Sequence, residues 1–312
     1  MRSPSRFAII AAFAAIYLVW GSTYLGILFA IESIPPLLMA GTRYFTAGVL
    51  MYGIARAQGA PRSAWADWRT AAIVGTLLLL GGNGGVTFAE QFVASGLAAV
   101  VIATVPIYIA LLGWLTGSAP RPTPIIWLGL AGGFCGVGIL LWPSLHFATT
   151  EHPHALAGML ILLFSAFSWS AGSLYSRRAK NAPSPFLAAG QQMLCGGALM
   201  FLLGLAMGEH HRFDLHRVTW LSLGAWIYLV LIGAIVGFTA YIWLLRHCDP
   251  AKVATYAYVN PIVAVFLGAM FAGEKLTLRT AVAAALIIGS VALVITVDQR
   301  KTKDVSVFAR AS

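Results

Sequence analysis

The feature that most constrains this chain is a series of apolar stretches, each close to the length of a helix that crosses a bilayer. A spanning helix needs about 20 mostly apolar residues. Ten windows satisfy this, at residues 7–31, 36–55, 70–92, 96–115, 124–142, 155–175, 185–207, 218–245, 253–272 and 281–297. Charged residues make up only 10% of the chain, against about 25% in a soluble domain. The sequence therefore predicts an all-α integral membrane protein with ten transmembrane helices.

The distribution of Lys and Arg between the loops predicts how these helices are oriented, because cytoplasmic loops carry an excess of basic residues. With the N-terminus inside, the inner segments hold fifteen Lys and Arg residues and the outer loops only four. We therefore expect a multi-pass protein of the cell inner membrane with both termini in the cytoplasm. The same dispersal of basic residues argues against a nucleic-acid partner, although the formal net charge is +10.

Two windows share a spacing of proline and glycine, in IATVPIYIALLG and in YAYVNPIVAVFLG, where Pro106 and Pro261 lie 155 residues apart. Five helices per half is an odd number, so a second copy of the first half would enter the membrane upside down. Interrupted helices at corresponding positions of inverted repeats point to a secondary transporter with a substrate site near the bilayer midplane. We expect repeats at residues 7–142 and 155–297 and a cytoplasmic tail at 298–312. The alternative is that both prolines only kink their helices for packing.

Aromatic and amide side chains recur on single helix faces within these windows. In the ninth window Tyr256 and Asn260 are four residues apart and share a face, and each half places one Trp deep in a helix. Such residues suit a cavity with aromatic walls and a few polar groups; alternatively, the aromatic residues pack helices and the amides bond between helices. The predicted cavity residues are Trp20, Tyr24, Asn83, Pro106, Trp169, Tyr256, Asn260 and Pro261.

Two ionisable residues lie within the windows, Arg43 in the second and Glu90 near the end of the third. Charged side chains inside a membrane are candidates for function, and pairing lowers their cost. We expect Arg43 and Glu90 to pair near the outer gate, with a gating or coupling role and with Glu90 as a candidate proton carrier. The alternative is an interfacial Glu and an Arg that anchors its helix.

The windows offer nothing that would hold a metal or an organic cofactor. All seven histidines lie in loops or at helix ends, so no metal site is expected. The GGNGG stretch at residues 81–85 has neither the strand–loop–helix context nor the following Lys of a phosphate-binding loop. No carboxylate cluster or activated nucleophile is apparent, and we expect the chain not to be an enzyme.

Several motifs, in this order, resemble the EamA branch of the drug/metabolite transporter superfamily, and the chain looks most like its YedA-type permeases. They are WGSTY at 20–24, AGTRYFTAG at 40–48, AYVNPIVAVFLG at 257–268, GEKLT at 273–277 and ALIIGSVALV at 285–294. The resemblance implies ten helices in two inverted five-helix repeats and export of small metabolites such as amino acids. With the polar faces above, it places helices one, three, four, six, eight and nine around the cavity. Glu274 of the GEKLT turn has no counterpart in the first half, where the turn reads GSAPRPT.

The sequence thus predicts a secondary transporter that exports small metabolites, such as amino acids or related amphiphilic solutes, by alternating access. A lipid or lipid-linked sugar flippase and a multidrug efflux carrier are the alternatives. Because Arg43 alone could neutralise an anion in the windows, zwitterionic amino acids and neutral to cationic amphiphiles are favoured over strongly anionic solutes. The expected partners are a small-molecule substrate and the lipid bilayer, while proton coupling and oligomeric state stay open.

Overall fold

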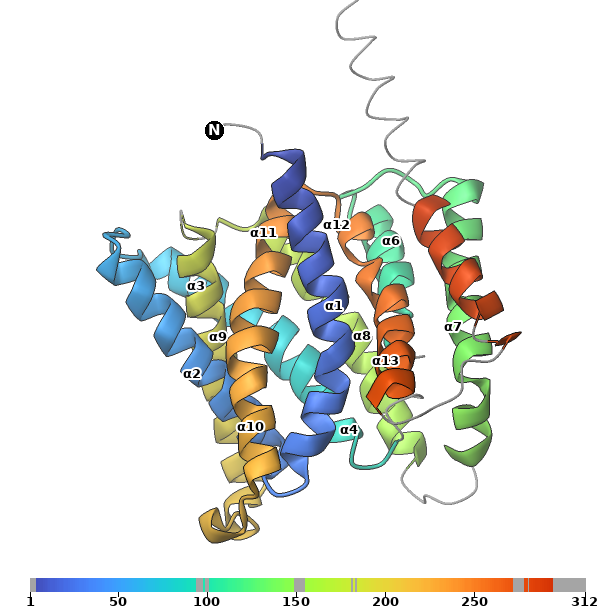
Figure 1. Cartoon of the computed structure of the whole chain (residues 1–312). Helices are drawn as coiled ribbons and strands as arrows, with labels where there is room; N and C mark the ends of the chain where they lie inside the picture. Colours follow the sequence, from blue (N-terminus) through green and yellow to red (C-terminus); the bar gives the residue numbers. More distant parts are fainter. Residues whose placement is uncertain are drawn as a thin grey trace, which may run out of the picture.

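The computed structural model describes residues 4–93, 98, 101–148, 155–180, 182, 184–271, 278–279 and 281–293, and every regular element in that part is a helix (Figure 1). Five helical runs are long and apolar enough to cross a membrane: Arg6–Ile31, Trp65–Ala89, Leu156–Arg178, Pro185–Ala206 and Trp220–His247. Shorter apolar helices occupy Val105–Leu115, Pro124–Ile139 and Ala281–Leu293. The chain is therefore an all-helical integral membrane protein, and each predicted window contains helix.

The helices follow one another with short connections. The first part of the chain forms α1 (Arg6–Ile31), α2 (Pro36–Ala57), α3 (Trp65–Val74), η1 (Gly75–Gly84), α4 (Gly85–Ala89), α6 (Val105–Leu115) and α7 (Pro124–Ala148). The second part forms α8 (Ala155–Arg178), α9 (Pro185–Ala206), η2 (Glu209–His211), η3 (Leu215–Arg217), α10 (Trp220–Tyr228), η4 (Leu229–Phe238), α11 (Thr239–His247), α12 (Pro250–Val253) and α13 (Tyr256–Phe271). A last helix follows at Ala281–Leu293.

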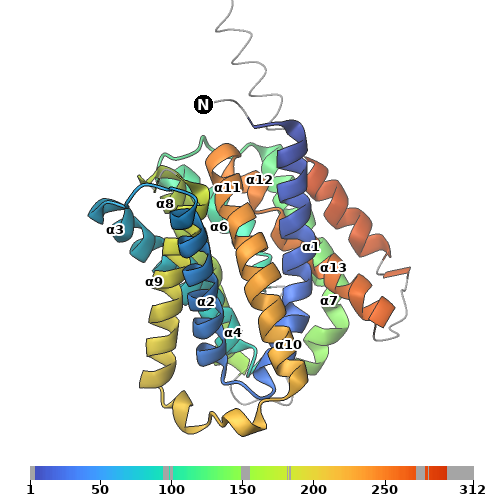
Figure 2. The same ribbon diagram turned by 60° about the vertical axis from the view of Figure 1, so that its left-hand side comes forward.

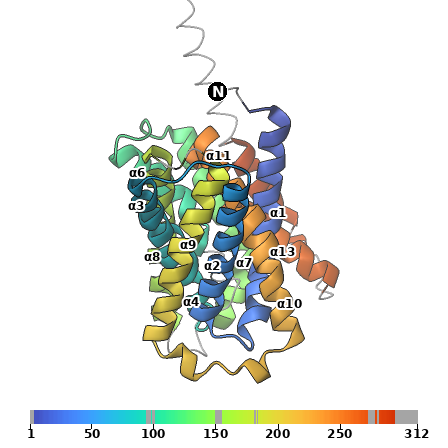
Figure 3. The same cartoon turned by 90° about the vertical axis from the view of Figure 1, so that its left-hand side faces the viewer.

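Two helix pairs form opposite edges of the bundle. Along one edge α2 and α9 run side by side, as Figures 2 and 3 show, and small residues bring them together. A Cβ atom at Gly197 would lie 2.4 Å from the backbone nitrogen of Phe45, so only glycine allows this approach. At the other edge α7 packs against the helix 281–293 through Gly136 and Ile287 (Figure 1). Packing by close backbone approach is typical of helices in lipid, where burial of apolar surface supplies little attraction.

The predicted correspondence of Pro106 and Pro261 is wrong in its structural detail. Pro106 lies in the first turn of α6, where its missing N–H would have no helical partner in any case. Pro261 lies inside α13. The interruption in each helix falls elsewhere, at Thr104 and at Thr255, and each of these threonines bonds through its hydroxyl to the carbonyl three residues before it.

Two long helical runs share a second irregularity, a π-helical segment near the middle. The run Trp65–Ala89 contains η1 and the run Trp220–His247 contains η4, and each segment is ten residues long. A π segment widens the helix and leaves carbonyls and side chains out of the ordinary α register, and it is frequent at functional sites. The glycines of the 81–85 stretch therefore occupy the end of a widened helix, next to α8.

Candidate functional site

A cavity lies between helices from both parts of the chain. Its volume is about 60 Å3, well below the usual range of small-molecule sites, so its walls must move apart to admit a substrate. It is lined by Trp20, Thr23, Tyr24, Ile27, Arg43, Tyr44, Gly82, Asn83, Val86, Ile102, Val105, Ser165, Trp169, Tyr256 and Asn260. Six of the eight predicted cavity residues are among them, and the two prolines are not.

The helices that supply these side chains differ in one respect from the expected set. The second helix, α2, contributes Arg43 and Tyr44 to the lining, although it was not expected at the cavity. The eighth helix was expected there but contributes no lining residue in the described part of the chain. Its segment η4 instead supports the cavity wall from behind, through contacts with Trp20 and Arg43.

Four aromatic rings meet at one side of the cavity. Trp20 lies at the centre, with its ring centroid 5.5 Å from that of Trp169, 5.0 Å from that of Tyr241 and 4.9 Å from that of Tyr256. The tilted and edge-to-face arrangements are those that aromatic quadrupoles favour. The two tryptophans are 8% and 7% exposed, so this cluster joins α1, α8, α11 and α13 inside the bundle.

Each tryptophan packs on a glycine in the π-helical run of the other half. A Cβ atom at Gly237 would lie 2.4 Å from Nε1 of Trp20, and one at Gly82 would lie 2.7 Å from Cε3 of Trp169. These distances leave no room for a side chain at either glycine. Trp20 also donates from Nε1 to the carbonyl of Gly233, at 3.2 Å, so the π segment η4 supplies both a close backbone contact and a hydrogen-bond acceptor.

Tyr241 is a buried residue of this site that the sequence reasoning missed. Its hydroxyl accepts a hydrogen bond from Nε1 of Trp169 at 2.9 Å and shares another with the hydroxyl of Ser173. It holds the Trp169 ring in place from behind the cavity wall. The available signal was weak: Tyr241 is one tyrosine in a long apolar run, and its partners are about 70 residues away in the chain.

Asn260 bridges two helices at the cavity wall. With its amide oriented so that the nitrogen faces two carbonyls, it donates to Tyr256 O at 3.1 Å and to Tyr17 O at 3.2 Å. The second bond ties α13 to α1, as the packing alternative supposed. The side chain also lines the cavity, so both roles predicted for it are compatible with its position.

Arg43 and Glu90 are both drawn into the interior, but they do not form the expected ion pair. Arg43 is 1% exposed, and its Nη2 donates to the hydroxyl of Tyr44 at 3.2 Å. Its Nε and Nη1 atoms, and both carboxylate oxygens of Glu90, are buried without a hydrogen-bond partner. The two residues interact only through space. Arg43 lines the cavity, whereas Glu90 is not among its lining residues.

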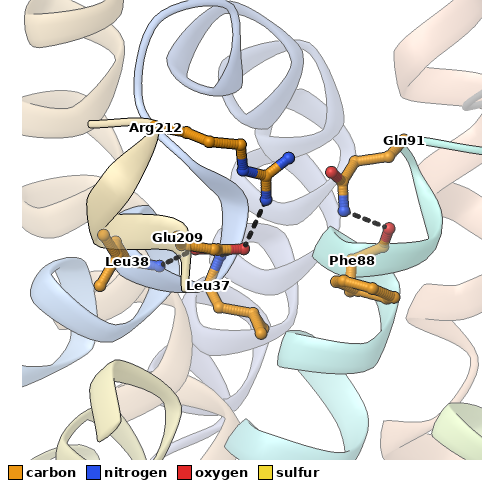
Figure 4. A network of polar contacts seen from close by, with 6 residues as sticks. All are labelled: Leu37, Leu38, Phe88, Gln91, Glu209 and Arg212. Atoms are coloured by element: carbon orange, nitrogen blue, oxygen red, sulfur yellow. Dashed lines mark hydrogen bonds and ion pairs between the residues drawn. The ribbon is translucent and has the colours of Figure 1, made fainter. Parts of the chain in front are cut away.

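A buried acid outside the cavity caps the start of α2 (Figure 4). Glu209 is fully buried and accepts hydrogen bonds from the backbone N–H groups of Leu37 at 3.2 Å and Leu38 at 2.9 Å. Arg212 lies 3.9 Å from the same carboxylate. The first N–H groups of a helix lack internal partners and attract negative charge, so Glu209 ties the α9–α10 connection to α2. No local sequence pattern indicates this contact, which spans 172 residues.

Within the described residues, no group of three His, Cys, Asp or Glu side chains lies close enough together to hold a metal ion. The polar groups at the cavity are hydroxyls, amides, indole nitrogens and one guanidinium. These groups bind by hydrogen bonding and by charge. The site is therefore suited to holding a small amphiphilic molecule.

Comparison with known proteins identifies relatives that are named as membrane transporters. The chain matches the EamA-like transporter family over residues 6–142 and again over residues 156–296. It is 36% identical over 295 residues to the Escherichia coli protein named "Uncharacterized inner membrane transporter YedA", a match that covers 94% of this chain and 92% of that one. It is 26% identical over 280 residues to a Salmonella typhimurium protein named "Probable amino-acid metabolite efflux pump", covering 84% and 86%.

A solved crystal structure shares the fold, with a TM-score of 0.75, 22% sequence identity and coverage of 95% of this chain and 99% of that one. The class defined by fold and cavity is a polytopic helical membrane protein with an internal cavity. The chain belongs to the EamA-like transporter family, and its similarity to YedA confirms the predicted YedA-type resemblance.

Proposed function

We propose that this protein is a secondary transporter that exports amino acids or related amphiphilic metabolites across a bacterial inner membrane by alternating access. The observation that carries the proposal is the cavity around Trp20, whose aromatic walls and few polar groups come from both parts of the chain. A wall of Trp20, Trp169 and Tyr256 suits an apolar body, and Arg43, Asn83 and Asn260 supply polar contacts. The efflux-pump name of one relative supports the direction and the solute class.

The architecture in this proposal is ten transmembrane helices in two inverted repeats, at residues 7–142 and 155–297. Three paired features support it: the helix breaks at Thr104 and Thr255, the π-helical segments η1 and η4, and the two tryptophan–glycine contacts. Each pair has one member in each half. The excess of Lys and Arg on one set of loops supports cytoplasmic termini.

The same paired features support a mechanism in which one half rocks against the other. The contacts of Trp20 with Gly237 and of Trp169 with Gly82 each join the two halves at the cavity. In both contacts a tryptophan ring lies against the backbone of a glycine, which has no side chain to interlock with the ring. Packed helices commonly move by small sliding shifts, and a shift at the Trp20 contact also breaks the hydrogen bond from Trp20 Nε1 to the Gly233 carbonyl.

The proposal is tested by counterflow in proteoliposomes loaded with unlabelled amino acids and diluted into a trace of the labelled amino acid. The wild-type protein should concentrate label transiently, because a carrier exchanges solute across the membrane. Asn260→Ala should lower that rate about tenfold, the value of one hydrogen bond to a substrate. The thermal stability of the variant, measured in parallel, separates loss of the site from loss of the α1–α13 bond.

The alternatives give different results in the same vesicles. A lipid or lipid-linked sugar flippase would move fluorescent lipid between leaflets and give no counterflow with any amino acid. A multidrug carrier would move hydrophobic cations in place of amino acids. Either result from a correctly folded sample contradicts the proposed substrate class.

A further inference from the structure

The guanidinium of Arg43 is a charged group in the cavity wall whose bonding capacity is largely unused. A guanidinium has five N–H donors. The Nη2 atom donates to Tyr44, and the Nε and Nη1 atoms have no partner. The carbon at the centre of the group lies 4.5 Å from the centroid of the Tyr44 ring, and Gly233 of η4 lies close to Nη2. These contacts fix the group without neutralising it.

A positive charge at this depth calls for a negative partner, because an unpaired ion costs several kcal/mol in a medium of low polarity. Glu90, the acid that acts on Arg43 through space, does not bond to it and keeps both oxygens without a partner. Arg43 is the only cation among the described residues that line the cavity. The site therefore matches one negative charge on a ligand, whereas an ammonium group placed beside Arg43 would be repelled.

The remaining groups in the cavity fit the rest of such a ligand. Planar guanidinium groups bind carboxylates through two parallel hydrogen bonds. In Arg43 either Nε or Nη1, both without a partner, can form such a pair with the second N–H of Nη2, whose first N–H donates to Tyr44. The buried Oδ1 atom of Asn83 also lacks a partner and can accept a hydrogen bond. Trp20, Trp169 and Tyr256 provide apolar and aromatic surface in the same space.

We propose that Arg43 binds the carboxylate of a monoanionic or zwitterionic substrate with an apolar or aromatic body, and that Asn83 Oδ1 accepts from the substrate's ammonium group where there is one. This assignment rests on the proposed transport function and narrows it. It gives Arg43 a role in substrate recognition in place of an ion pair at a gate. It also excludes the neutral and cationic amphiphiles that the sequence left open.

The test uses probes that differ only in the head group: L-phenylalanine, 3-phenylpropionate, L-phenylalaninamide and phenethylamine. Binding to the purified full-length protein in detergent is followed by quenching of tryptophan fluorescence, since Trp20 and Trp169 lie in the cavity. The two carboxylates should bind at least ten times more tightly than the amide and the amine. Arg43→Gln should weaken binding of both carboxylates by about 10- to 100-fold, and it should not weaken binding of the amide or the amine, because their ammonium groups are no longer repelled.

Two further variants separate recognition from a structural role. Arg43→Lys keeps the charge but loses the paired donors, so it should retain part of the preference for carboxylates. Arg56→Gln makes the same change as Arg43→Gln on the same helix, outside the cavity, where Arg56 bonds to the carbonyl of Ala60. It should bind all four probes as the wild type does.

Each other outcome overturns the assignment. Equal binding of acid and amide, equal weakening of all probes by Arg43→Gln, or no binding of either carboxylate would each contradict it. The proposed function fails separately. If the probes bind with the expected selectivity but no counterflow is seen, the binding site is supported and the transport function is contradicted. If counterflow is seen and Arg43→Gln does not slow it, the transport function is supported and the role of Arg43 is contradicted.

Discussion

The contact between Trp20 and Gly237 allows a quantitative prediction for the variant Gly237→Ala. The added Cβ would lie 2.4 Å from Nε1 and 2.9 Å from Cδ1 of the indole, so the ring must move. Overpacking of this kind costs about 1–3 kcal/mol. The movement also lengthens the 3.2 Å hydrogen bond to the Gly233 carbonyl, which is worth about 1 kcal/mol.

Gly224→Ala is the matched control for this variant. Gly224 lies in the same helical run, and a Cβ atom there would meet nothing within 4 Å. Both changes gain the same helix propensity, about 1 kcal/mol, so the difference between the variants isolates the contact with Trp20. Gly237→Ala should therefore have a free energy of unfolding about 2–4 kcal/mol lower than that of Gly224→Ala.

The assay is thermal unfolding in detergent, followed with a thiol-reactive dye that reports exposure of Cys195 and Cys248, both partly buried in the folded protein. The expected difference in midpoint is about 5–10 °C. Gly82→Ala, which would press on Trp169 in the other half, should resemble Gly237→Ala. Equal midpoints for Gly237→Ala and Gly224→Ala would refute the reasoning, because the ring would then have room to spare.

Three further changes test other parts of the structure. Glu209→Ala should lower the unfolding midpoint in the same assay by several degrees, since it removes charged hydrogen bonds to two N–H groups at the start of α2; an unchanged midpoint would show that the cap contributes nothing. Tyr241→Phe should lower the free energy of unfolding by about 1–3 kcal/mol, because the buried Nε1 of Trp169 loses its acceptor, and a silent change would contradict the role given to Tyr241. Glu90→Gln should abolish the response of counterflow to an imposed pH gradient if Glu90 carries the proton, and a response equal to that of the wild type would exclude this role.

The membrane class and the residues of the cavity could be predicted from the sequence because they depend on local patterns. Length and apolarity define a spanning helix, and residues spaced by four share a helix face, which is why Tyr256 and Asn260 were placed on one wall. Trp20 and Trp169 could be paired because they occupy similar positions in two similar helices. In these cases the information lies within a single helix.

Other features depend on contacts between distant helices or on local backbone geometry. Glu209 was missed because its partners at α2 lie 171 and 172 residues away, and an acid in a loop looks like a solvated one. The predicted ion pair between Arg43 and Glu90 is wrong for this conformation. Two residues at a similar depth in the membrane need not have side chains that point toward each other. Each proline is followed by a glycine at the same spacing, but Pro106 lies in the first turn of α6 and Pro261 lies inside α13. This difference depends on where the preceding helical segment ends, which the spacing does not show.

The central claim is that the cavity between the two halves opens alternately to the two sides of the membrane. The most direct test is a single cysteine at Ser165, a fully buried cavity residue, in a background without Cys135, Cys195 and Cys248. Ser170→Cys, buried on the same helix but absent from the cavity lining, is the control. The account predicts that a membrane-impermeant thiol reagent reaches Ser165→Cys from either side of oriented vesicles, that substrate slows the reaction, and that Ser170→Cys does not react. Reaction from one side only under all conditions, or equal reaction of the two variants, would contradict it.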